Sequence, residues 1–250
     1  MTETDLVFTG MIFETGIIVV AFIVLVLIFL KYLEKRQKLT FYLFLIFLFM
    51  VVSIIFSWLS KVLRLYSGLD YIIDDDVVDP GTMTSWFLLR ITQFRLTFVF
   101  LMIAIYLSYV LKVNLFEKGY NKTHKIIVIF YGIIGSLYLL IIYFKGELIF
   151  DLIAFIIVSV YMFVIYFPFM KSCYTAARNV EDRVYKNAFL SLVVMALCFI
   201  LILICQLIDR ILIISLEILG YTPFYFAGWI FAIIGLIGAY LGYIRPKSNE

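Results

Sequence analysis

The 250-residue chain has few of the side chains that metal sites and disulfide scaffolds need, with one histidine and three cysteines. His124 lies among lysines in a polar connection, and Cys173, Cys198 and Cys205 fall in or beside apolar segments. With no second histidine and no cysteine cluster, we expect no metal, no other cofactor and no disulfide. Intramembrane proteolysis would need deep paired aspartates, a serine–histidine pair or a zinc triad, so we expect no enzyme.

Charge is scarce as well. Charged residues make up 15% of the chain, hydrophobic residues 65%, and the mean hydropathy is +1.12, far outside the range of soluble domains. A formal net charge of +3 gives no basis for nucleic-acid binding. The lipid bilayer is therefore the expected partner, and we expect a multi-pass protein of the cell membrane.

Seven apolar blocks follow one another along the chain, each long enough to cross about 30 Å of hydrocarbon as a helix. They cover residues 10–30, 39–60, 86–111, 126–144, 148–170, 187–208 and 222–244. Backbone groups in lipid must be satisfied within their own segment, and no alternating barrel pattern occurs. The sequence predicts an all-α fold, a single seven-helix transmembrane domain over residues 1–250.

The basic residues are distributed unevenly between the connections. Segments 31–38, 112–125 and 171–186 hold four lysines or arginines each, and Arg245 and Lys247 lie on the same predicted side. The opposite side is acidic, and its acids are Glu3, Asp5, Asp70, Asp74, Asp75, Asp76 and Asp79. Basic residues in short loops favour the cytoplasmic side. We therefore predict that the N-terminus is outside and the C-terminus inside.

Ionisable side chains within apolar spans cost about 2.5–3.5 kcal/mol each on insertion scales, so they are candidates for function. Here these residues and the nearby amides lie toward the predicted outer ends of the spans. The candidate ligand-binding residues are Glu14, Arg90, Gln93, Arg95, Asp151, Gln206 and Asp209, with Arg210 beside them. They could line an outward-facing polar cavity, form a buried ion-pair network that fixes helix register, or reach out to the lipid headgroups.

Seven-residue spacing places further residues on shared helix faces. One stripe on the third predicted span comprises Arg90, Thr97, Ala104 and Ser108. A second, on the sixth span, comprises Ser191, Cys198, Cys205 and Asp209. The last span carries Gly228, Gly235, Gly238 and Gly242, a glycine face that predicts close helix packing.

The layout of seven spans with an outer N-terminus, short basic inner loops and an arginine-containing linker before span six resembles the sensor regions that precede histidine kinases in prokaryotic signalling proteins. The resemblance implies a receptor-like protein that senses a ligand or membrane signal at the outer cavity. Because the given sequence ends at Glu250, we expect output through a separate cytoplasmic partner at the 112–125 and 171–186 loops.

The alternative is a small-solute transporter or channel. Segments 106–110 and 240–244, with the sequences YLSYV and YLGYI, both end spans at the predicted inner face. Such an internal sequence similarity would fit a parallel-repeat layout of three spans, one linking span and three spans.

Overall fold

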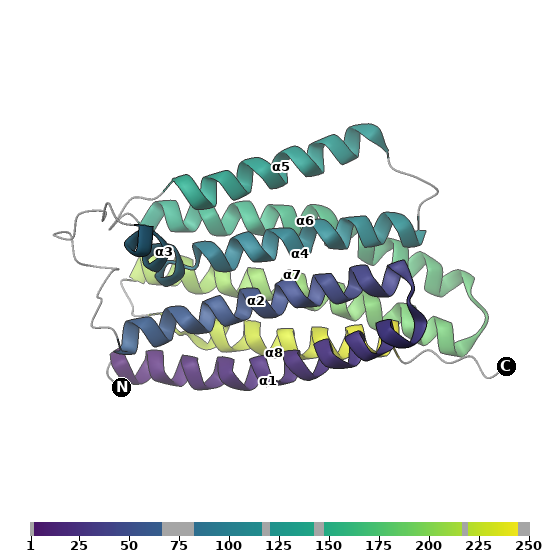
Figure 1. Ribbon diagram of the computed structural model, residues 1–250, viewed down its shortest axis with the longest axis horizontal. Helices are drawn as coiled ribbons and strands as arrows, with labels where there is room; N and C mark the ends of the chain where they lie inside the picture. The colour runs from purple at the N-terminus through teal and green to yellow at the C-terminus, as the bar shows by residue number, and fades with distance from the viewer. Residues whose placement is uncertain (1–2, 67–82, 117–120, 143–147, 217–219, 245–250) are drawn as a thin grey trace.

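The computed structural model describes residues 3–66, 83–116, 121–142, 148–216 and 220–244, and these are helical apart from short connections (Figure 1). The helices are α1 Glu3–Lys35, α2 Lys38–Tyr66, α3 Met83–Thr92, α4 Arg95–Phe116, α5 Lys122–Ile141, α6 Leu148–Asn179, α7 Arg183–Leu216 and α8 Pro223–Ala239, with a final π-helical turn η1 Tyr240–Ile244. All except α3 and η1 are long and apolar enough to cross a membrane. The prediction of an all-α protein with seven helices of this kind is confirmed.

Six of the long helices form a ring. Around it, α1 packs on α2, α2 on α4, α4 on α6, α6 on α7, α7 on α8, and α8 returns to α1. The remaining long helix, α5, packs outside this ring against α4 and α6 and forms one edge of the molecule in Figure 1. Its outward side chains, such as Ile126, Phe130 and Leu137, are exposed, as expected for a surface that faces lipid.

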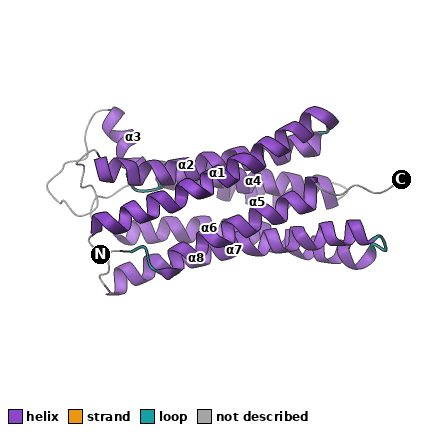
Figure 2. Cartoon of the chain, turned by 90° about the horizontal axis from the view of Figure 1, so that it is seen from below, coloured by secondary structure: helices purple, strands orange, loops and turns teal. Residues whose placement is uncertain are grey.

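The two ends of the bundle differ in what they contain. We call one the α3 end, because α3 lies there together with the start of α1 and the last turn of α2 (Figures 1 and 2). The charge pattern predicts that this end faces outward. Several residues used in that prediction lie outside the described residues: Asp70, Asp74, Asp75, Asp76, Asp79, Lys118, Arg245 and Lys247.

The single helix predicted over 86–111 is divided in the structure. The amide of Phe94 bonds to the carbonyl oxygen of Ile91 at 3.1 Å, and α4 begins at Arg95. Phe94 has φ +58°, a left-handed conformation that is costly for a large side chain. Because of this break, Arg90 and Thr97 are not on one continuous helix, so the stripe expected on this span is interrupted.

The glycine face of α8 packs against α7. A Cβ atom added to Gly235 would lie 3.4 Å from the Cβ of Cys198, and one added to Gly228 would lie 3.5 Å from the Cβ of Cys205. At Gly238 the added atom would lie 2.9 Å from the backbone oxygen of Ser191. The predicted small-residue stripe of α7 therefore lies against the predicted glycine face, and the two backbones approach closely.

Candidate functional site

A cavity of about 170 Å³ lies within the ring, and all six ring helices contribute to its wall. Along α2 it extends from Arg64 to Met50, a rise of about 21 Å for a helix. Polar residues gather in its half nearest the α3 end: Ser57, Ser60, Lys61, Arg64, Thr92, Gln206, Asp209, Arg210 and Tyr221. Its deeper half is mostly apolar, with Phe98, Met162, Phe199, Leu203 and Leu236, and its polar residues there are Ser53 and Thr97. The cavity is therefore amphipathic along its length.

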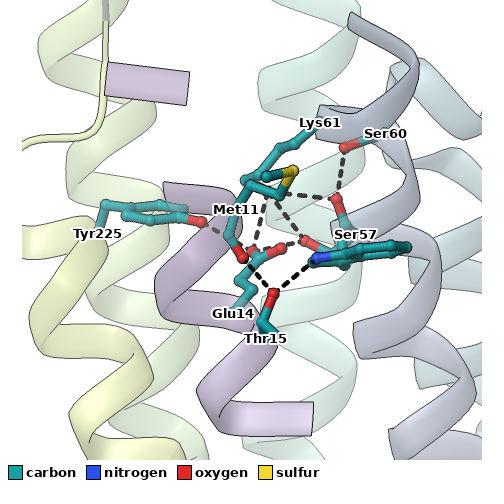
Figure 3. Close-up of polar contacts among 8 residues, drawn as sticks. Met11, Glu14, Thr15, Ser57, Ser60, Lys61 and Tyr225 are labelled. Atoms are coloured by element: carbon teal, nitrogen blue, oxygen red, sulfur yellow. Dashed lines mark hydrogen bonds and ion pairs between the residues drawn. The ribbon is translucent and has the colours of Figure 1, made fainter. Parts of the chain in front are cut away.

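A buried ion pair joins α1 and α2 beside the polar half of the cavity (Figure 3). The Nζ of Lys61 donates to Oε1 of Glu14 at 2.9 Å, and the exposed fractions of the two side chains are 1% and 0%. The same oxygen accepts from Ser57 Oγ at 2.9 Å and from the Tyr225 hydroxyl at 2.7 Å. Glu14 thus connects three helices through one carboxylate oxygen, while its Oε2 has no hydrogen-bond partner.

Helical spacing explains how α2 brings its polar residues to this place. Ser53, Ser57, Lys61 and Arg64 recur at intervals of three or four residues, and Ser60 lies three residues after Ser57, which puts all five on one face of a helix. That face lines the cavity. The sequence prediction ended this span at residue 60 and so omitted Lys61 from the candidate site. Continuing the serine spacing by one turn would have found it.

Arg210 lies in the cavity wall on aromatic rings. Its guanidinium carbon is 5.1 Å from the centroid of Phe94 and 5.2 Å from that of Phe155. The Nζ of Lys61 lies over the same Phe94 ring, 5.0 Å from its centroid. The left-handed backbone at Phe94 thus places one ring against two cations, an arrangement that cation–π attraction stabilises.

Gln206 and Asp209 also line the cavity. Asp209 is buried, and its Oδ1 accepts from the backbone N–H of Thr222 at 2.8 Å and from the Thr222 hydroxyl at 2.6 Å. Thr222 is the residue that precedes α8. Asp209 therefore links the C-terminal part of α7 to the start of α8. Tyr221 is the neighbour of Thr222, and burial raises the pKa of Tyr221 to about 12.

A second ion pair lies outside the residues that line the cavity. An Nη of Arg95 on α4 donates to Oδ1 of Asp151 on α6 at 2.6 Å. With its amide nitrogen turned toward this carboxylate, Gln93 donates to both Asp151 oxygens at 3.3 Å. Three of the predicted site residues therefore come together as a polar cluster between two neighbouring helices.

Arg90 takes a separate position. Its Nε donates to the backbone oxygen of Leu140 at 3.1 Å, and its guanidinium lies 4.2 Å from the ring centroid of Trp86. It joins α3 to the last turn of α5. The predicted site residues thus divide into three groups: Gln206 and Asp209 in the cavity wall with Glu14 behind Lys61, the cluster around Asp151, and Arg90.

Toward the opposite end of the bundle the ring is filled. Phe199 ends the main cavity, and the Tyr166 ring packs edge-on against it with centroids 5.6 Å apart. The Tyr166 hydroxyl lies 2.8 Å from Ser108 Oγ, and Phe47 and Phe169 beside it are buried. The void left among these residues is about 10 Å³, at the lower limit for one water. The cavity is therefore blind.

Within the described part of the chain, no group of three or more histidine, cysteine or acidic residues is placed to hold a metal ion. The site comprises cations, hydroxyls and aromatic rings beside an apolar wall, which suits binding by charge and shape. Comparison with known proteins adds nothing to this description: no family model, no curated protein and no solved structure matches the chain.

Proposed function

We propose that this chain is a receptor-like membrane protein that binds a ligand in the ring cavity and transmits a change in helix packing to a separate cytoplasmic partner. One observation carries the proposal: the cavity is polar toward the α3 end and stops at Phe199. A binding site needs access from one side only, whereas a transporter has to open its path to each side in turn.

The floor of the cavity offers a route for the signal. Phe199 lies beneath the cavity and also against the glycine face of α8, where a Cβ added to Gly235 would lie 2.7 Å from the Phe199 ring. A ligand that displaces this ring must therefore act on α8. Ligand binding changes the conformation only if the ligand favours one packing over the other. The far ends of α6 and α7 lie in the 171–186 segment proposed for partner contact.

The test is accessibility to a membrane-impermeant thiol reagent applied from each side. In a background with Cys173, Cys198 and Cys205 replaced by alanine, single cysteines are introduced as Gln206→Cys in the cavity and Ser108→Cys below its floor. We expect Gln206→Cys to react from the α3 end alone and Ser108→Cys from neither side. Elution of each variant as one species by size exclusion shows that the bundle is intact.

The transporter alternative is favoured by the position of α5. This helix lies outside the ring, so the ring consists of three long helices before it and three after it. That arrangement fits the three-one-three layout. The same accessibility experiment separates the two functions, because a transport path predicts that Ser108→Cys reacts from the end opposite α3 in at least one state.

A further inference from the structure

The charges of the cavity indicate which ligands it can hold. Among the described lining residues, Lys61, Arg64 and Arg210 are cationic and Asp209 is the acid. Together with Glu14, the partner of Lys61, two acids face these three cations, so the cavity and its ion pair carry one net positive charge. Arg64 makes contacts of its own, which leaves Arg210 as the cation most available to a ligand anion.

Arg210 is positioned but not paired. Within the described residues it makes no hydrogen bond or ion pair, and its guanidinium contacts the rings of Phe94 and Phe155. Aromatic contacts restrict the plane of a guanidinium while its N–H groups, which lie in that plane, stay able to donate. A half-buried guanidinium held in this way is suited to a planar or tetrahedral anion.

The remainder of the cavity is mostly apolar, with Ser53 and Thr97 as its polar residues. Beyond the polar half the wall is made of buried side chains, among them Phe98, Met162 and Leu203. At about 170 Å³ the cavity is only slightly larger than the engineered apolar cavity of about 150 Å³ that binds benzene. The whole cavity, polar half included, therefore has room for a molecule of about six carbon atoms.

We propose that the ring cavity binds a small amphipathic anion, with its negative group against Arg210 and its apolar tail directed toward Phe199. This inference rests on the proposed function, since it names the ligand class of the same site. The anion is a small solute from the aqueous phase, because a single-chain membrane lipid is too large for a cavity of this volume that is closed at Phe199.

The test uses hexanoate, with hexanol and hexylammonium as neutral and cationic analogues, added to the purified full chain in nanodiscs. Trp229 lines the cavity, so its fluorescence is the readout, measured with Trp58 and Trp86 replaced by phenylalanine. We expect saturable binding of hexanoate in preference to both analogues, and binding about tenfold or more weaker in Arg210→Gln. Lys35→Gln, which removes an exposed cation at the opposite end, should bind hexanoate as the unmodified chain does.

Equal binding of hexanol and hexanoate, or undiminished hexanoate binding in Arg210→Gln, would overturn the inference. If Arg210→Gln does not fold, Arg210→Lys takes its place, and it should keep the preference for the anion with weaker binding. Failure of all three probes to bind, with Gln206→Cys still reactive from the α3 end alone, rejects the ligand class and leaves the proposed receptor intact.

The experiment also distinguishes ligand binding from signalling. Tyr174 is exposed in the 171–186 segment, so the reactivity of Tyr174→Cys reports on the signal. Hexanoate binding that depends on Arg210, without any change in the reactivity of Tyr174→Cys, supports the site and rejects signalling. Nanodiscs made with and without oleate then test the size limit. We expect oleate not to compete with hexanoate, and competition between them would contradict a closed cavity of about 170 Å³.

Discussion

The ammonium of Lys61 lies 2.9 Å from the carboxylate of Glu14, and neither side chain is accessible from outside the protein. Each charge alone would be costly inside a bundle of apolar helices, and together they compensate one another. Ser57 and Tyr225 complete the contacts of the shared oxygen. The pair is therefore both a connection between helices and the polar support of the cavity wall.

Replacing Lys61 by methionine should destabilise the protein by about 3–5 kcal/mol, because Glu14 is left as a buried charge without its cation. Adding Glu14→Gln to Lys61→Met should recover part of this loss. Reversible unfolding in mixed micelles measures both. The matched control is Lys31→Met, which removes the more exposed pair with Glu34 and should cost at most about 1 kcal/mol. Equal losses for the two lysine variants would contradict a buried pair.

Gly238→Ala should lower the melting temperature. The added Cβ would lie 2.9 Å from a backbone oxygen and 3.2 Å from a backbone nitrogen of α7, so α7 and α8 have to separate. Gly16→Ala is the control, since no atom lies within 4 Å of its added Cβ. There the better helix propensity of alanine, worth up to about 1 kcal/mol, should leave the melting temperature unchanged or raise it. Tolerance of Gly238→Ala would show that the helices are not in such close contact.

Asp209→Ala should cost about 2 kcal/mol or more, because the Thr222 amide and hydroxyl lose a shared acceptor at the start of α8. Asp209→Asn keeps an acceptor oxygen and should lose less than half as much. Urea or SDS titration of the two variants gives the comparison. If the asparagine variant is as unstable as the alanine variant, the negative charge of Asp209 matters more than its hydrogen bonds.

Tyr221 predicts an alkaline loss of stability. Burial raises its pKa to about 12, above the ordinary value of 10.0. Between these values the unfolded chain has released the phenolic proton while the folded chain still holds it, so stability falls as the pH rises. Tyr221→Phe should reduce the slope of melting temperature against pH from 10 to 12. An unchanged slope would assign the alkaline effect to other groups.

Apolar length was sufficient to predict the seven long helices, because lipid permits few alternatives to a helix of about 20 residues. The break at Phe94 was not predictable in this way, since neither glycine nor proline marks it. At the break the Phe94 ring contacts Lys61 and Arg210, which belong to other helices and are not identified by apolar length. Lys61 itself was omitted because the predicted span was ended before the first charged residue after the apolar block. In the structure α2 continues to Tyr66.

The order of the helices around the ring was equally inaccessible, because apolar length carries no information about neighbours. Glu14 and Asp151 were both identified as candidate site residues only because an ionisable side chain in an apolar span costs free energy. The structure assigns them to different partners, Lys61 and Arg95. Which buried charge meets which is decided by helix packing, and a single sequence does not contain that pairing.

The ring is closed by contact between its first and last helices, and this has a consequence for synthesis. Lys61 follows Glu14 by 47 residues, so the two charges can meet as soon as α1 and α2 have both left the ribosome. Tyr225 follows Glu14 by 211 residues and arrives with the final span. During translation the charge of Glu14 can therefore be compensated by Lys61 early, while the cavity beside it is completed only when the last helix is inserted.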